Sequence, residues 1–438
     1  MTPQPETATS SAKMDTRRNV IAYTGDTVGF FSGMAFIPAT TVLVGLASAL
    51  TRDKTLIGIV AMAWGVASLF PQLIAARFVQ GKRRTKPIVI LTSAFGRQTM
   101  LLFALWLLFT NAQSPLLTIW LLIGAIVIFN VVDSITGIAW FDMLSRNLSP
   151  RGRGRILGTA QFLGSLAGIG SGLIVSRILS PEGLPFPQNY AVVIICAWLG
   201  FMVSFAFQFA YQENPATQPY HASEESGSFT SRIVDCIKTD KVFRRVLLTR
   251  LLSGLEAMSA AFYVVYVKER LQLPDTAIGV FSLSFIIGGI VGVAWFTWLA
   301  SRTGARNVVR AATVLQAAAP IGALGAALIP GIETIPIVGY IVFALILAIN
   351  GAASRAYILG FGGYAIDIAP ATNRSMYVAI INTLSGLVGL SPVLSGIWLD
   401  AASGNAGAYP YLFGVVAAIA GAGAIISFTL PRPTQLDA

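Results

Sequence analysis

Long runs of apolar residues, broken by short polar loops, dominate the chain between its polar ends. An α-helix needs about 20 such residues to cross the hydrocarbon of a bilayer. A membrane β-barrel would instead need alternating strands of about 10 residues, a pattern that this chain lacks. We therefore predict an all-α membrane protein with twelve spans, at 20–48, 56–78, 87–110, 115–145, 154–178, 189–211, 243–268, 276–299, 306–329, 335–366, 373–399 and 407–430.

The polar breaks recur at a spacing of about 220 residues, half of the chain. Asn130 precedes Pro150 by 20 residues, just as Asn350 precedes Pro370, and each proline opens a loop that carries arginine. A duplicated apolar chain predicts two pseudo-symmetric bundles of six helices, with a working site between them. The predicted parts are a cytoplasmic tail at 1–19, a bundle at 20–211, a linker at 212–242, a bundle at 243–431 and a tail at 432–438.

The linker changes character along its length. Its first part has the composition of a turn or linker. In its second part, Phe229, Ile233 and Ile237 recur at the spacing of one helix face, with basic residues elsewhere around the helix. This spacing predicts an amphipathic helix on the cytoplasmic leaflet. A solvated, charged linker is the alternative.

Composition agrees with the pattern, because 55% of the residues are hydrophobic and only 11% are charged. The net charge of +11 suggests nucleic acid at first, but most of the 30 Lys and Arg residues fall on one side of the predicted spans. This is the positive-inside pattern, and it predicts that both termini are cytoplasmic. We expect a multi-pass monomer of the bacterial inner membrane, in contact with lipids and without a nucleic-acid partner. The polar first 19 residues lack the apolar core of a signal peptide.

The loop after the second span of each half carries a recurring set of residues. Each loop holds an arginine, a glycine and a trailing base: Arg77, Gly81 and Arg83 in the first half, and Arg302, Gly304 and Arg306 in the second. With its twelve spans and central polar segment, the chain resembles the major facilitator superfamily, whose members carry Gly-x-x-x-Asp-Arg-x-Gly-Arg-Arg in this loop. The resemblance implies a secondary active transporter of a small solute that works by rocker-switch alternating access.

Both loops depart from the family pattern in lacking the acid, which is Ala76 in one and Ser301 in the other. In the family, that acid is thought to latch the cytoplasmic ends of the two halves. Asp142 and Arg146, four residues apart near the end of the fourth span, would supply a substitute ion pair. A surface salt bridge of little value is the alternative. We place these residues, with Arg97, among the candidates for conformational control.

Charges inside the spans are few, and each one costs about 2.5–3.5 kcal/mol on insertion scales. They are Asp26, Arg97, Asp133, Arg250, Glu256 and Arg355. The first two fall at a similar depth and predict a buried pair, which is either structural or rearranges during transport. The resemblance places Asp133, Glu256 and Arg355 on spans that line the central cavity of the family.

Helical spacing adds an asparagine or a tyrosine to the helix faces of these residues. Convergent polar groups in an apolar cavity are typical of a small-molecule site. The candidates for substrate binding and proton coupling are Asp26, Asn130, Asp133, Glu256, Tyr263, Asn350, Arg355 and Tyr357.

Desolvation favours protonation of a carboxylate in such a cavity, whereas a neighbouring arginine favours its charged form. An anionic solute that binds Arg355 would therefore free Glu256 to take up a proton, which predicts proton coupling. Simple neutralisation of Glu256 by Arg355 is the alternative, and sodium coupling or facilitated diffusion stay open.

Sequence motifs for catalysis are missing, since the chain has no P-loop, no His or Cys cluster and no nucleophile elbow. We therefore expect neither an enzyme nor a bound metal or cofactor. A lipid or amphiphile flippase of the same fold, and a membrane sensor or assembly factor that does not transport, are the alternative functions.

Overall fold

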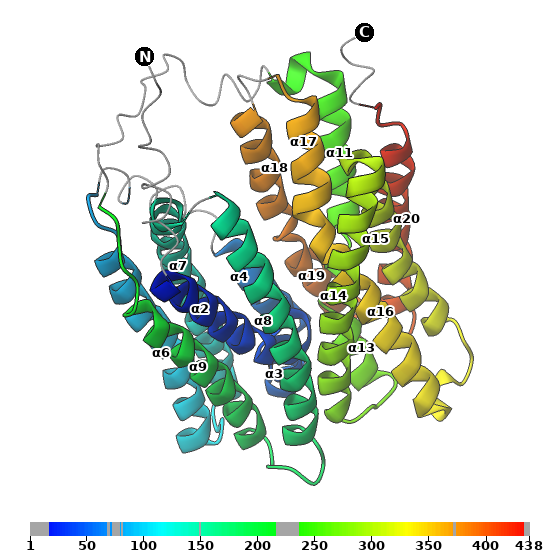
Figure 1. Cartoon of the computed structure of the whole chain (residues 1–438). Coiled ribbons are helices and arrows are strands. Elements are labelled where there is room, and N and C mark those ends of the chain that lie inside the picture. The colour runs from blue at the N-terminus through cyan, green and yellow to red at the C-terminus, as the bar shows by residue number, and fades with distance from the viewer. Residues whose placement is uncertain are drawn as a thin grey trace, which may run out of the picture. The chain divides into compact units, whose positions relative to one another are not determined.

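A computed structural model of the chain describes residues 17–67, 82–148, 150–215, 236–370 and 374–432, with positions 71 and 79. Every regular element in these ranges is a helix (Figure 1). Within these described ranges, ten helices are long and apolar enough to cross a membrane, and two shorter apolar helices lie at Lys54–Val66 and Gly386–Ala401. Each overlaps one predicted span, so the prediction of an all-α membrane protein is confirmed. Most of the predicted amphipathic helix lies outside the described residues.

The chain forms two compact units, and the division falls at Pro38 and at Ala67. Residues Ala39–Val66 therefore belong to the second unit, although they lie early in the sequence. The helices of the first unit are α2 (Arg17–Phe36), α6 (Lys86–Thr110), α7 (Pro115–Asn147), α8 (Pro150–Ile178) and α9 (Gln188–Gln208).

The second unit contains several interrupted helices. Two π-helical turns occur, η1 at Ala39–Leu43 and η3 at Tyr357–Gly362, and η2 is a 3-10 turn at Ile332–Thr334. The α-helices are α3 (Val44–Leu50), α4 (Lys54–Val66), α11 (Lys241–Gly254), α12 (Ala257–Ala260), α13 (Tyr263–Glu269), α14 (Thr276–Thr303), α15 (Ala305–Ala327), α16 (Pro336–Ala356), α17 (Gly363–Ile368), α18 (Arg374–Val388), α19 (Ser391–Ala401) and α20 (Ala408–Phe428).

Equivalent helices pack together inside each unit. In the first unit α2 packs on α9, and α6 packs on α7 and α9; in the second, α11 packs on α20, and α15 packs on α16 and α20. In both units, a basic side chain donates to a backbone carbonyl just beyond the last helix. Lys86 Nζ donates to the carbonyl of Tyr211 (2.7 Å), and Arg306 Nε donates to that of Leu430 (2.7 Å). Cations satisfy the free carbonyls of a helix C-terminus. The two bases are about 220 residues apart, which agrees with the repeat in the sequence.

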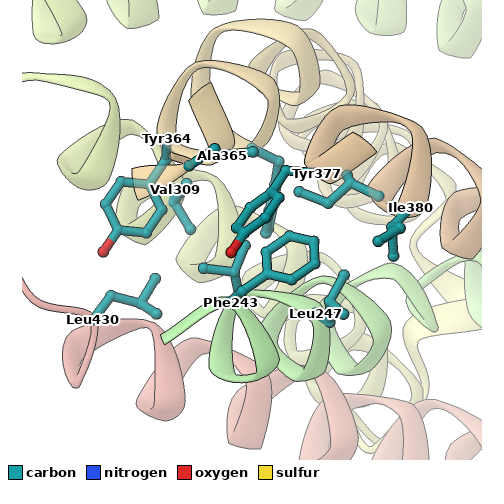
Figure 2. Packing of buried hydrophobic residues seen from close by; sticks show 12 residues of the cluster. Phe243, Leu247, Val309, Tyr364, Ala365, Tyr377, Ile380 and Leu430 are labelled. Atoms are coloured by element: carbon teal, nitrogen blue, oxygen red, sulfur yellow. The ribbon is translucent and has the colours of Figure 1, made fainter. Parts of the chain in front are cut away.

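A cluster of buried side chains holds the start of α11 against α15, α17 and α18 (Figure 2). The rings of Phe243 and Tyr377 lie 4.0 Å apart between centroids. Tyr377 also donates its hydroxyl to Asp240 Oδ2 (2.8 Å), while Asp240 Oδ1 accepts from the backbone nitrogens of Val242 and Phe243. Asp240 is therefore the N-cap of α11 and joins it to α18.

The helices α14 and α16 approach so closely that glycine is required at their crossing. A Cβ added to Gly351 would lie 2.0 Å from the carbonyl oxygen of Phe285, and one added to Gly288 would lie 1.9 Å from that of Ala348. Small residues permit this backbone approach between membrane helices.

Residues Ala39–Val66 are held to the rest of the second unit by polar contacts at the start of α4. Asp400 accepts from the backbone nitrogens of Lys54 and Thr55 (2.8 Å each) and so satisfies free donors at this helix end. Lys54 Nζ pairs with Glu269, whose Oε2 accepts from the hydroxyl of Tyr409 (2.7 Å). These contacts lie at the end of the spans that we predict to face outside.

We predict that Gly351→Ala lowers the midpoint of thermal unfolding by several degrees, because overpacking a helix crossing costs about 1–3 kcal/mol. Tryptophan fluorescence of the purified protein in detergent measures this midpoint. The control is Gly325→Ala in α15, where an added Cβ meets nothing within 4 Å. That variant should keep or raise the midpoint, since alanine favours a helix over glycine by roughly 1 kcal/mol. Equal midpoints for the two variants would contradict the close crossing.

Candidate solute-binding site

A cavity of about 370 Å³ lies within the second unit. Residues from α11, α15, α16, η3 and α18 and from the interruption after α11 form its walls. Its polar side chains are Arg250, Glu256, Gln316, Asn350 and Ser354. A mainly apolar cavity with a few convergent polar groups is the usual form of a small-molecule site.

The spanning helix at Lys241–Glu269 is interrupted at Glu256, a feature that the continuous apolar pattern did not predict. Beyond Gly254, several backbone hydrogen bonds join residues three apart instead of four: Ser259 N donates to Glu256 O and Phe262 N donates to Ser259 O, both at 2.9 Å. Irregular backbone at membrane depth is tolerated where protein or a water-filled cavity surrounds it. The interruption places Glu256 in the wall of the cavity.

Glu256 is 7% exposed, and its described partners are neutral. Asn350 Nδ2 donates to Glu256 Oε1 at 2.7 Å, and the hydroxyl of Tyr263 reaches the same oxygen at 3.5 Å. The Tyr263 hydroxyl also shares a hydrogen bond of 2.9 Å with Ser259 Oγ. The predicted association of Glu256, Tyr263 and Asn350 is therefore present. Among the described residues, none donates a hydrogen bond to Oε2.

Arg250 lies on α11, six residues before Glu256. Its guanidinium carbon is 5.5 Å from the centre of the Phe361 ring, a cation–π distance. Its Nη1 lies 2.8 Å from the position that a Cβ would take at Gly254. The missing side chain at Gly254 therefore gives the guanidinium space to fold along the helix toward Glu256.

Arg355, the predicted partner of Glu256, is not among the residues that line the cavity. Its Nε lies 3.1 Å from the position of a Cβ at Gly289, so the side chain runs along α14. The arginine in the cavity is Arg250, to which the sequence analysis gave no role. Ser354 lines the cavity, whereas the side chain of Tyr357 lies outside what the structure describes.

In the first unit, Asp26 is 4% exposed and surrounded by donors from other helices. Trp140 Nε1 donates to Oδ2 at 2.7 Å, and Gln208 Nε2 donates to Oδ1 at 3.3 Å. The hydroxyls of Ser204 and Tyr211 also donate to this carboxylate. The network joins α2, α7 and α9 with the segment after α9.

The predicted pair of Asp26 and Arg97 is present, with Arg97 Nη2 at 3.9 Å from Asp26 Oδ1. Arg97 Nη1 donates to the carbonyl of Phe201 (2.7 Å), and the guanidinium also interacts electrostatically with Asp133. Asn130 donates its amide to the carbonyl of Ile126 (2.9 Å) on its own helix. Because neutral donors crowd Asp26, the geometry favours the structural interpretation of its pair with Arg97.

A family model described as Major Facilitator Superfamily matches residues 27–349, most of the chain. The chain belongs to the major facilitator superfamily. A comparison with curated protein sequences gives no match.

Solved transporters of the superfamily fold share this architecture at low sequence identity. A variant of the nucleoside transporter NupG is 14% identical with a TM-score of 0.70, over 94% of this chain and 100% of that one. A bacterial homologue of the human lysosomal transporter Spinster is 14% identical with a TM-score of 0.63, over 100% and 99%. A bacterial homologue of the iron transporter ferroportin is 12% identical with a TM-score of 0.63, over 94% and 98%. At these identities the likeness shows the fold alone.

In the first half, Glu213 follows α9 and lies beside the start of α6. Its carboxylate accepts from the backbone nitrogens of Thr85 and Lys86, the latter at 3.2 Å, and so caps α6. Arg146 Nη1 lies 3.8 Å from Glu213 Oε1, and Arg146 also forms the predicted pair with Asp142.

The other candidates from the superfamily loops have local roles where they are described. Arg146 donates to the carbonyl of Arg83 (3.2 Å), and the guanidinium of Arg302 lies 5.2 Å from the Trp298 ring. Gly304, with φ 83°, turns the chain between α14 and α15, a conformation that favours glycine. Arg77 and Gly81 lie outside the described residues.

The sequence analysis missed three residues that contact charged side chains far from them in the sequence. Trp140 and Tyr211 donate to Asp26, and Glu213 lies close to Arg146. Glu213 is the first acid after the sixth span, and this position was a usable signal. Nothing in the sequence alone indicates that Trp140 and Tyr211 share the carboxylate of Asp26. No group of three His, Cys, Asp or Glu residues suited to a metal occurs in the described ranges.

We predict that Asp26→Asn strongly destabilises this superfamily member, because the new amide nitrogen would face hydrogen-bond donors and Arg97 would lose one of its counter-charges. Removing one partner of a buried pair costs roughly 3–5 kcal/mol. Thermal unfolding in detergent should show a large fall in the midpoint. The control is Glu182→Gln, which removes an ion pair with Arg177 whose side chains are 82% and 81% exposed, and it should leave the midpoint unchanged. A wild-type midpoint for Asp26→Asn would exclude the structural role.

Proposed function

We propose that the chain is a secondary active transporter that moves a small polar solute across the membrane by alternating access, driven by the proton gradient. The observation that carries this proposal is the cavity of about 370 Å³ with Glu256 in its wall, at the interruption of a spanning helix. A cavity of this size suits a small solute. Interrupted helices at membrane depth are a frequent feature of transporter binding sites.

Proton coupling is supported by the surroundings of Glu256. A buried carboxylate is costly unless it is paired with a cation or protonated. Its described hydrogen-bond partners are Asn350 and Tyr263, and the ion pairs between described residues do not include it. Uptake of a proton removes the cost of the buried charge without requiring a protein cation. Glu256 is therefore our candidate for the proton-binding residue.

Alternating access is supported by the way residues Ala39–Val66 are attached. They continue from α2 of the first unit but pack on the second. Their attachment rests on polar contacts, those of Asp400 with Lys54 and Thr55 and the pair of Lys54 with Glu269. The hydroxyls of Thr41 and Ser282 add a buried hydrogen bond of 2.6 Å. Polar contacts exchange readily with water, so we propose that this segment changes its partners during the transport cycle.

The comparisons support transport in general and leave the solute to be identified. Similar structures are described as a nucleoside transporter, a bacterial metal transporter and a POT family transporter in complex with a thioalcohol-conjugated peptide, so their solutes or ligands are chemically different. We propose a polar solute because the cavity carries two charged side chains and two amides.

Glu256→Gln should lose solute-driven proton movement at least about tenfold, because glutamine cannot take up a proton at neutral pH. Proteoliposomes that enclose a pH-sensitive dye would be exposed to amino acids, nucleosides, sugars and small carboxylates. The wild type should move protons with at least one class, and Glu182→Gln is the surface control. Undiminished proton movement in Glu256→Gln would exclude this residue from coupling. Movement of a labelled phospholipid instead of these solutes would favour a flippase.

Weakening the attachment of residues Ala39–Val66 should expose the buried Ser282. In a chain with Cys196→Ser and Cys236→Ser, we predict that Lys54→Gln speeds the labelling of Ser282→Cys by an impermeant maleimide. The rate should rise about tenfold if the lost contact is worth about 1.4 kcal/mol. The control is Ser403→Cys, an exposed position in the loop between α19 and α20, which should label equally fast with either residue at position 54. An unchanged rate at Ser282→Cys would contradict a mobile segment.

A further inference from the structure

We propose that the second unit binds the headgroup of an anionic phospholipid at Arg306 and Arg310, near the end of α15 that we predict to be cytoplasmic. The two arginines lie where α15 packs beside α20 (Figure 1). Neither of them lines the cavity that contains Glu256. This lipid site is therefore distinct from the solute cavity, and lipid binding goes beyond the proposed transport function.

Both arginines reach the end of α20 from one face of α15, because they are four residues apart. Arg306 Nε donates to the carbonyl of Leu430 (2.7 Å), and Arg310 Nη2 donates to that of Phe428 (2.6 Å). The carbonyl end of a helix carries roughly half a negative charge. The two guanidinium groups bring two full positive charges, which is more than the end of α20 compensates.

The remaining positive charge has no counter-charge in the described part of the chain. The ion pairs between described residues include neither Arg306 nor Arg310, and the two guanidinium groups repel each other. Asp240 and Asp367 interact electrostatically with Tyr364, as the two arginines do. Neither carboxylate forms an ion pair with either arginine. A full counter-charge therefore has to come from outside the described residues.

The equivalent corner of the first unit contains an acid. Two residues after the carbonyl of Tyr211, to which a lysine of α6 donates, the chain has Glu213, whose Oε1 lies 3.8 Å from Arg146 Nη1. Two residues after the carbonyl that Arg306 contacts, the chain has Arg432 instead. The second unit thus places a base where the first unit places an acid. An anion from the membrane would compensate the second corner as Glu213 compensates the first.

The side chains around the two arginines suit the boundary between lipid headgroups and acyl chains. The guanidinium carbon of Arg310 lies 5.2 Å from the centre of the Phe428 ring, and this ring is 57% exposed. Ile425 and Val314, each within about one turn of these residues, are exposed as well. Trp298, near the end of α14, is half exposed, and tryptophan is enriched at membrane interfaces. Acyl chains can cover this apolar surface while the arginines reach the headgroup.

The chemistry of a guanidinium suits the phosphate of a lipid. Within the described residues, Arg306 donates only through Nε, so its two Nη groups are available to an anion. Guanidinium donors match phosphate oxygens in pairs. Zwitterionic lipids also carry a phosphate, but their ammonium group cancels its charge. The excess of positive charge at this corner therefore favours a lipid with a net negative charge, as basic pockets between membrane helices do.

Native mass spectrometry of the full chain in detergent tests the site, because it counts the lipids that the protein retains. Equal amounts of phosphatidylglycerol, which is anionic, and phosphatidylcholine, which is zwitterionic, would compete for the protein. We expect the wild type to retain at least about tenfold more phosphatidylglycerol, since each basic side chain near an anionic surface contributes about fivefold. Equal retention of the two lipids would overturn the proposal. So would loss of phosphatidylglycerol to an excess of inorganic phosphate, which would indicate a site for free phosphate.

Substitutions at the two arginines assign the preference. Arg306→Gln and Arg310→Gln should each lower it about fivefold. Arg306→Lys should retain most of it, because lysine keeps the charge. The matched control is Arg177→Gln, which removes an arginine whose side chain is 81% exposed and paired with Glu182, and it should leave the preference unchanged. An undiminished preference in both glutamine variants would contradict the assignment and overturn the proposal.

Arg432→Glu tests the site without removing Arg306 or Arg310, which also hold the end of α20. This variant places an acid where the first unit has Glu213. It should abolish the preference for phosphatidylglycerol and keep the unfolding midpoint at or above that of the wild type. A full preference in Arg432→Glu would overturn the proposal. A preference that the wild type lacks and Asp437→Asn acquires would also overturn it, because an acid of the chain would then compensate the arginines.

Discussion

Every charged side chain at hydrocarbon depth has to be compensated by the protein, because lipid offers neither hydrogen bonds nor counter-charge. The first unit meets this constraint by crowding donors around one carboxylate. Asp26 accepts from Trp140, Gln208, Ser204 and Tyr211 in addition to its pair with Arg97, and these donors come from α7, from α9 and from the segment that follows α9. The charge therefore fixes the packing of the helices that supply them. A carboxylate satisfied in this way has little capacity left for a solute.

The second unit uses an equivalent framework but places fewer described donors around its buried carboxylate, Glu256, than the first places around Asp26. In each unit a base from another helix, Lys86 or Arg306, donates to a carbonyl just beyond the last helix, so the two frameworks correspond closely. Their cores differ. The amide of Asn130 donates to a carbonyl on its own helix, whereas the amide of Asn350 donates to Glu256, and both Asn350 and Glu256 line the cavity. The two units thus share the contact between a base and the end of the last helix, whereas the asparagines at their centres have different hydrogen-bond partners.

Most helix boundaries could be predicted from the sequence, because charges and prolines mark where the apolar runs end. The span predicted at 87–110 is the helix Lys86–Thr110, and the one predicted at 115–145 is Pro115–Asn147. The interruption at Glu256 and the π-helical turns were not predictable in this way. Apolar residues continue through them, and a change from four-residue to three- or five-residue hydrogen bonding leaves the composition unaltered. The cavity wall depends on one of these interruptions.

The choice between Arg250 and Arg355 shows why the site was only partly predictable. Spacing along a helix indicates which residues share a face, but the direction of that face depends on packing. Each of these arginines lies beside a glycine that gives it space, Gly254 and Gly289 respectively. The first glycine is four residues from its arginine on the same helix, so the arrangement is visible in the sequence. The second is on another helix and becomes visible only in the fold. The position of a charge in a span therefore depends on the glycine that admits it as much as on the group that pairs with it.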